Sequence, residues 1–140
     1  MLRVVLDTNV VISGLIWRGT PHQLLAALLQ DAFTAHTSYS LIFELPRKLM
    51  GSKLSAELLK RDISAQQLDM SYSALCDIIS VNALATPVCG DPDDDAVLAC
   101  AKTAKADYIV SGDQDLLVIQ VFEGMPIITP EEALTQFRIA

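Results

Sequence analysis

The sequence predicts a three-layer α/β/α sandwich with a central, mostly parallel sheet. Short apolar runs of strand length alternate with longer segments of helical periodicity, which is the pattern of parallel strands joined by crossover helices. Helix-start signals precede several of the helical segments independently of one another. The chain has 140 residues and no internal repeat or change of composition, so we expect one domain over residues 1–140.

Local signals in the N-terminal part predict strand, helix and strand in that order. Residues 2–6 form a short apolar run and predict a buried first strand. A helix is expected to begin at Thr20, with Thr20 as its cap, Pro21 in the first turn and Gln23 completing a capping box. Residues 33–37 predict the second strand.

The middle of the chain is predicted to be mainly helical. Residues 38–50 have the pattern of a helix that Gly51 closes, and Pro46 is expected to kink it or to start a new turn. Residues 54–63 and 65–80 predict two more helices.

The C-terminal part returns to alternating strands and helices. The expected elements are strands at 79–83, 108–110 and 126–128, and helices over 92–105 and from 129 onward. Asp91 and Pro92 provide the cap and first-turn residue of one helix. Thr129 and Glu132 form a capping box for the other, so both helix starts are well specified.

Composition excludes several classes of protein. Apolar residues make up 51% of the chain and mean hydropathy is +0.38, yet no run of 18 uncharged apolar residues predicts a membrane span. The N-terminus lacks the apolar core of a signal peptide, so a cytoplasmic location is expected. Cys76, Cys89 and Cys100 are odd in number and widely spaced, which favours free core thiols over disulfides or a zinc site.

The charge of the chain is acidic and unevenly distributed. Acids outnumber bases 17 to 10, giving a net charge of −7, which disfavours a simple basic-patch nucleic-acid binder. Seven of the 17 acids lie in residues 91–115. Such a cluster is either a solvated face or a cation site.

The predicted topology brings three groups of acids to one edge of the sheet. Asp7 follows the first strand, Asp113 and Asp115 follow the strand at 108–110, and residues 93–95 form the first turn of a helix. The carboxyl ends of parallel strands share an edge, where open α/β proteins hold ligands. The alternative is that the helical acids only cap their helix and that Asp113 and Asp115 are ordinary turn residues.

Converging carboxylates require a partner charge. Two charges about 4 Å apart repel by roughly 4 kcal/mol at an effective dielectric near 20, so either some acids are protonated or a cation joins them. Oxygen ligands alone favour Mg²⁺ or Mn²⁺. Residues 91–102 do not form a calcium-binding EF-hand loop, because Ala96 is at the position that requires Gly and Lys102 is at the position that requires Glu.

Four motifs in order resemble a known family. They are LDTN at Asp7, SLIFEL with Glu44, DPDDDAVLACA with Asp95, and ADYIVSGDQDLL with Asp113. Together they resemble the PIN-domain ribonucleases, and most closely the bacterial toxin components of toxin–antitoxin pairs, of the VapC type. The resemblance runs from residue 2 to about residue 134 and includes IITPEEAL near the end.

The resemblance implies the residues of an active site. Its catalytic acids, which would also hold the metal, are Asp7, Glu44, Asp95 and Asp113. The supporting positions are Asn9, Ser111 and Asp115.

The resemblance also implies roles for the supporting residues. Asn9 would orient Asp7, and Ser111 would orient a water or Asp113. Asp94 competes for the third acidic position, and we prefer Asp95 because it precedes the Ala-x-Leu-Ala run of the family helix. The chain departs from the family pattern at Pro46, which interrupts the helix of Glu44, and at Ala96, where relatives often carry a larger polar residue.

The resemblance further implies a metal-dependent endoribonuclease that uses one or two Mg²⁺ or Mn²⁺ ions to activate water against an RNA phosphodiester. Its partners would be RNA, a cognate antitoxin protein and a second copy of the chain, with no membrane. We expect RNA to be contacted by a few bases, namely Arg18, Arg47, Lys48 and Lys53, and the alternative is that these are solvated surface charges. The alternatives are an inactive PIN-like module that binds RNA or protein, or a phosphoryl-transfer α/β domain with an aspartate nucleophile.

Overall fold

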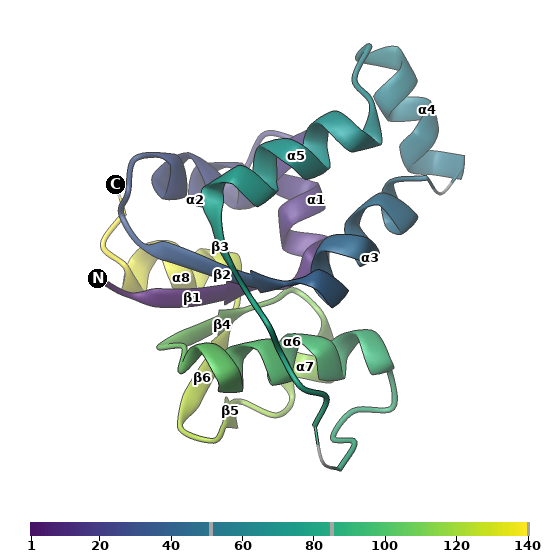
Figure 1. Cartoon of the computed structure of the whole chain (residues 1–140). Coiled ribbons are helices and arrows are strands. Elements are labelled where there is room, and N and C mark those ends of the chain that lie inside the picture. Colours follow the sequence, from purple (N-terminus) through teal and green to yellow (C-terminus); the bar gives the residue numbers. More distant parts are fainter. Residues whose placement is uncertain (51, 85, 140) are drawn as a thin grey trace.

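The computed structural model describes residues 1–50, 52–84 and 86–139 (Figure 1). Within these ranges, six strands form one sheet in the order β3-β2-β1-β4-β6-β5. The strands are β1 (Arg3–Leu6), β2 (Thr34–Ser38), β3 (Cys76–Ile79), β4 (Tyr108–Val110), β5 (Val121–Phe122) and β6 (Met125–Ile128). Neighbouring strands pair in parallel, except that β5 pairs antiparallel with β6.

Eight helices lie within the described ranges. They are α1 (Thr8–Ile16), α2 (Thr20–Leu29), α3 (Tyr39–Leu49), α4 (Ser52–Lys60), α5 (Ala65–Leu75), α6 (Pro92–Ala104), α7 (Gln114–Leu117) and α8 (Pro130–Gln136). Helices α1, α2, α5 and α8 lie on one side of the sheet, and α6 and α7 lie on the other (Figure 1). None of these helices is long and apolar enough to cross a membrane.

The sheet is buried on both faces, because successive side chains of β1 pack alternately into two cores. Val4 and Leu6 belong to the core under α1 and α2, whereas Val5 belongs to the core under α6. Successive side chains of a strand point to opposite faces, so the apolar run over residues 4–6 needs helices on both sides of the sheet. The predicted three-layer sandwich with a mostly parallel sheet is therefore confirmed.

Helix starts at α6 and α8 follow the predicted chemistry. The Asp91 side chain accepts a hydrogen bond from the Asp93 N–H at 2.8 Å, and Lys105 ends α6 in a left-handed conformation. At α8, Thr129 accepts from the Glu132 N–H and the Glu132 side chain accepts from the Thr129 N–H, which is a complete capping box. These reciprocal bonds satisfy backbone donors that a helix start leaves free.

The structure contradicts the predicted cap of α2 and confirms the extent of α3. Gly19, not Thr20, is the N-cap residue of α2, and no side chain caps this helix start. The helix predicted over residues 38–50 is present as α3, which continues past Pro46 to Leu49 although Pro46 has no N–H to donate to the preceding turn. The kink expected at Pro46 stays a prediction. The predicted closure by Gly51 lies outside the described residues.

Elsewhere the structure differs from prediction in the bounds of elements and in three elements that were not predicted, and the strand expected at 79–83 lies earlier, at Cys76–Ile79. The helix expected over 65–80 ends at Leu75, and the next four residues form β3 beside β2. Helix α1, the short helix α7 and strand β5 were not predicted. Helix α1 begins at Thr8, with only Asp7 between it and β1, so no turn separates the strand from the helix.

Candidate metal centre

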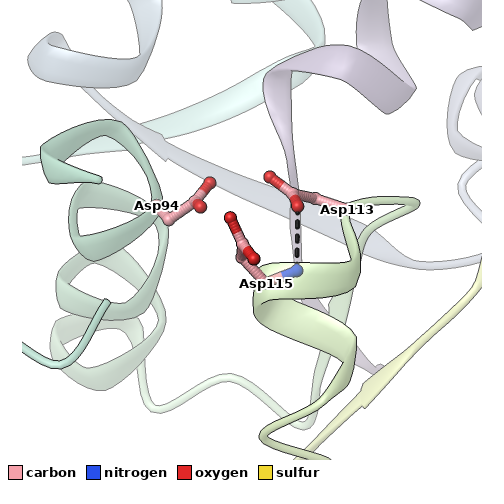
Figure 2. A group of neighbouring side chains, drawn as sticks. All are labelled: Asp94, Asp113 and Asp115. Atoms are coloured by element: carbon pink, nitrogen blue, oxygen red, sulfur yellow. Dashed lines mark hydrogen bonds between the residues drawn. The ribbon is translucent and has the colours of Figure 1, made fainter. Parts of the chain in front are cut away.

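Three aspartates meet at the carboxyl edge of the sheet (Figure 2). Asp94 lies in the first turn of α6, Asp113 is the N-cap residue of α7, and Asp115 lies in the first turn of α7. One carboxylate oxygen of each lies within 4.8 Å of the others. The Asp115 N–H donates to Asp113 Oδ1 at 2.9 Å, which fixes these two acids relative to each other.

Asp94 is the buried member of this cluster. Its side chain is 5% exposed, and Oδ2 is buried without a hydrogen-bond partner. Burial, followed by the charges of Asp113 and Asp7, raises the pKa of Asp94 to about 7. A buried oxygen that faces other carboxylates and lacks a donor is costly unless a cation or a proton joins it, so this set of oxygens fits a hard divalent cation.

Asp7 and Ser111 connect the ends of the two central strands. Asp7 follows β1 and is 3% exposed, while Ser111 follows β4 and is fully buried. Ser111 Oγ donates to Asp7 Oδ2 at 2.8 Å and accepts from the Asp113 N–H at 2.9 Å. Burial raises the pKa of Asp7, and the hydrogen bond from Ser111 partly opposes that rise.

Glu44 lies on α3, near the end of β1 that Asp7 follows. Both carboxylate oxygens of Glu44 have partners. Thr8 Oγ1 donates to Oε2 at 3.2 Å, and Lys48 Nζ lies 2.6 Å from Oε1. Lys48 Nζ also donates to Asn9 Oδ1 at 3.3 Å. Burial raises the pKa of Glu44, while the hydrogen bond and charge of Lys48 oppose that rise.

The structure separates Asp95 from these acids. Asp95 Oδ1 accepts hydrogen bonds from the N–H groups of Val88 and Cys89, at 3.2 and 2.8 Å. Its side chain lines a pocket of about 520 Å³ between the start of α6 and the loop before it. Adjacent residues of a helix point about 100° apart, so only one of Asp94 and Asp95 can face Asp113. Our preference for Asp95 does not agree with this geometry, because Asp94 faces Asp113 instead.

The other predicted site residues fall into two groups. Asp7, Asp113 and Asp115 gather at the sheet edge as expected from the topology, and Ser111, which the resemblance implied, lies with them. Asn9 is exposed, and its side-chain oxygen accepts a hydrogen bond from Lys48. The hydrogen bond to Asp7 that we predicted for Asn9 is made by Ser111 instead.

Sequence reasoning missed Thr8 and Lys48 as parts of this site. It found no Lys or Arg close to Asp7 in the sequence, yet the Lys48 charge acts on Asp7 as well as on Glu44. The available signal was the four-residue spacing of Glu44 and Lys48, which places two side chains on one helix face. Lys53, another base considered for RNA contact, has a side chain outside the described set.

Comparisons with known proteins agree with this architecture. The family model described as PIN domain matches residues 3–115. An uncharacterized protein from Methanocaldococcus jannaschii is 32% identical over 120 residues, which are 85% of this chain and 76% of that protein. The structure of VapBC2 from Rickettsia felis, bound to a DNA fragment from their promoter, matches with a TM-score of 0.58 at 14% identity. That match covers 91% of this chain and 98% of the other, and it shows a shared fold.

Proposed function

Because this chain belongs to the PIN domain family, we propose that it is a metal-dependent endoribonuclease that hydrolyses RNA phosphodiester bonds. Family membership confirms the resemblance to PIN domains seen in the sequence, and the nuclease activity general in that family supports the proposal. The observation that carries the proposal is the group formed by Asp94, Asp113 and Asp115, in which a buried Asp94 oxygen lacks a partner. We treat residues 1–140 as a single domain of this kind.

The residues that would hold Mg²⁺ or Mn²⁺ are Asp94, Asp113 and Asp115, with Asp7 beside them. All donors are oxygens, which are the ligands these ions prefer. When bound, the ion would activate water as a nucleophile and offset negative charge on the phosphodiester. Asp94 takes the role that we first gave to Asp95, because Asp95 is engaged with the N–H groups of the preceding loop.

The chain itself supplies rigid placement of these acids. Ser111 holds Asp7 through its hydroxyl and holds Asp113 through that residue's backbone N–H. Thr8 and Lys48 fix the two oxygens of Glu44. Side chains that orient ligating carboxylates in this way raise metal affinity by limiting the arrangements the ligands can adopt.

We further propose that the protein is the toxin of a toxin–antitoxin pair. The Rickettsia felis neighbour is a VapBC complex, and its fold is the one found here. An acidic centre of this kind would be blocked by an Arg or Lys side chain of a cognate antitoxin. A second copy of the chain is the other proposed protein partner. We also propose a cytoplasmic location, which the three free cysteines support because thiols stay reduced in that compartment.

The decisive experiment is cleavage of labelled cellular RNAs by the purified chain with Mn²⁺, with Mg²⁺ or with EDTA. We expect metal-dependent cleavage that is lost in Asp7→Asn and Asp94→Asn. Asp62→Asn is the matched control, since Asp62 is an exposed aspartate away from the acidic centre whose left-handed backbone Asn tolerates. Absence of both cleavage and Mn²⁺ binding in the wild type would overturn the proposal and favour a PIN-like module that binds without cutting.

A further inference from the structure

The acidic centre consists of Asp7, Glu44, Asp94, Asp113 and Asp115. We propose that the ammonium group of Lys48 is a permanent cation of this centre and takes the place of a second divalent ion. The centre would then bind one Mg²⁺ or Mn²⁺, at the Asp94 end, while Lys48 neutralises the Glu44 end. This inference rests on the proposed metal-dependent function and specifies how many metal ions that function uses.

The contacts of Lys48 Nζ are those of a bound cation. It lies 2.6 Å from Glu44 Oε1 and donates to Asn9 Oδ1 at 3.3 Å. A carboxylate oxygen and an amide oxygen are also ligands that a hard divalent ion takes. Lys48 Nζ therefore stands at a point where the protein directs two such oxygens, and a metal ion could not share that point with it.

Burial explains why Glu44 needs a permanent partner. The Glu44 side chain is 3% exposed and that of Lys48 is 32% exposed. A buried carboxylate without a partner is strongly destabilising, and the four-residue spacing on α3 brings Lys48 over Glu44. The distance of 2.6 Å between Lys48 Nζ and Glu44 Oε1 is that of a charge-assisted hydrogen bond, so Lys48 is the cation that accompanies Glu44.

The opposite end of the centre has no such partner. Among the described residues, no lysine or arginine forms an ion pair with Asp94, Asp113 or Asp115. Asp94 Oδ2 also lacks any hydrogen-bond donor. One end of the acidic centre is thus neutralised by the chain and the other is not, which is the arrangement expected for one divalent ion plus one ammonium.

Counting bound Mn²⁺ tests this division directly. Free Mn²⁺ measured by electron paramagnetic resonance during titration gives the number of ions per chain without any assay of activity. We expect one ion in the wild type and two in Lys48→Met, because the substitution frees the oxygens of Glu44 and Asn9. Lys48→Arg should retain one ion, since the positive charge stays on the same helix face.

Two further variants isolate the Glu44 end. Adding Glu44→Gln to Lys48→Met should return the count to one, because the second ion would need the Glu44 carboxylate. Arg47→Met is the control, since Arg47 is the adjacent cation of α3 but pairs with the partly exposed Asp93 at 3.5 Å. It should leave the count at one. Circular dichroism would show that each variant is folded.

The outcomes separate this inference from the proposed function. Two ions in the wild type would overturn the role of Lys48 while leaving a metal-dependent nuclease intact, and this result does not depend on any variant folding. A count of one in folded Lys48→Met would also overturn it. No bound Mn²⁺ in the wild type would overturn the proposed metal-dependent function and this inference together.

Discussion

Ser111 Oγ lies 2.8 Å from Asp7 Oδ2, joining residues that follow the neighbouring strands β4 and β1. The same oxygen accepts a hydrogen bond from the Asp113 N–H. One hydroxyl therefore fixes the separation between a buried aspartate at the end of β1 and the loop that carries Asp113. Because Ser111 is fully buried, no water can readily replace it in either contact.

Replacing Ser111 with Ala should weaken both stability and metal binding. The loss leaves the Asp113 N–H without its partner, at a cost of about 1–3 kcal/mol in the free energy of unfolding. It also frees Asp7 to rotate, and we expect Mn²⁺ affinity to fall by about 10- to 100-fold. Urea denaturation and Mn²⁺ titration give the two values.

Ser38→Ala provides the matched control for Ser111→Ala. Ser38 is a similarly buried serine that caps α3, with its hydroxyl accepting from the Leu41 N–H at 3.3 Å. Its loss should lower stability by about 1 kcal/mol, as for other helix caps, and leave Mn²⁺ affinity near that of the wild type. Equal losses of affinity in both variants would mean that Ser111 acts only through stability.

Adjacent aspartates at the start of α6 should respond differently to the same substitution. Asp94→Asn removes a charge that faces Asp113, so Mn²⁺ binding and RNA cleavage should be lost. Asp95→Asn retains a side-chain oxygen that accepts from the N–H groups of Val88 and Cys89, so Mn²⁺ binding and RNA cleavage should both persist. Calorimetric titration with Mn²⁺ distinguishes the two. Retained binding in Asp94→Asn with loss in Asp95→Asn would assign the metal-binding role to Asp95, as the sequence predicts.

The sequence predicted the fold well where local chemistry decides it. The cap at Asp91 and the capping box at Thr129 and Glu132 are short-range interactions, and the structure contains both. The start of α1 has no comparable signal, because its N-cap residue Asp7 makes no side-chain capping bond. The Asp7 side chain is instead used by Ser111 from another strand, a contact that local patterns do not encode.

The candidate site was predicted in outline and missed in detail for related reasons. Parallel topology alone indicated that Asp7 and Asp113 would share an edge of the sheet. The choice between Asp94 and Asp95 depended on a helix rotation of about 100°, which sequence spacing near a helix start does not determine. Lys48 is distant from Asp7 in the sequence, and only the packing of α3 against the end of β1 brings its charge there.

Gly14 permits the close approach of α1 and α2, and replacing it should destabilise the fold. A Cβ at this position would lie 2.6 Å from Leu25 Cδ1 and 2.8 Å from the Pro21 carbonyl oxygen. The carbonyl cannot move without shifting α2, so Gly14→Ala should cost about 1–3 kcal/mol in the free energy of unfolding. Thermal or urea unfolding measures this cost.

Gly90→Ala is the corresponding control. A Cβ at Gly90 would meet no heavy atom within 4 Å, so stability should change little. If Gly14→Ala were as stable as Gly90→Ala, α1 and α2 would be less closely packed than the structure shows.

The acidic centre should make the metal-free protein less stable as pH rises. The folded-state pKa of Asp94 is about 7 against an ordinary value of 3.8, so between these values the folded chain binds more protons than the unfolded chain. The free energy of unfolding must therefore fall as pH increases through that range, by at most about 4 kcal/mol from Asp94. The raised pKa values of Asp7 and Glu44 contribute with the same sign.

Asp94→Asn isolates this effect from other titrating groups. Burial lowers the pKa of His36, which makes stability rise with pH below about 6.5 and opposes the acids. Urea denaturation in EDTA from about pH 5 to about pH 8 should show a fall in the wild type that is much smaller in Asp94→Asn. Added Mn²⁺ should stabilise the wild type more at the higher pH, because its ligands must be deprotonated. Parallel curves for the two proteins in EDTA would show that Asp94 is ionised throughout this range and that no proton stands in for the cation.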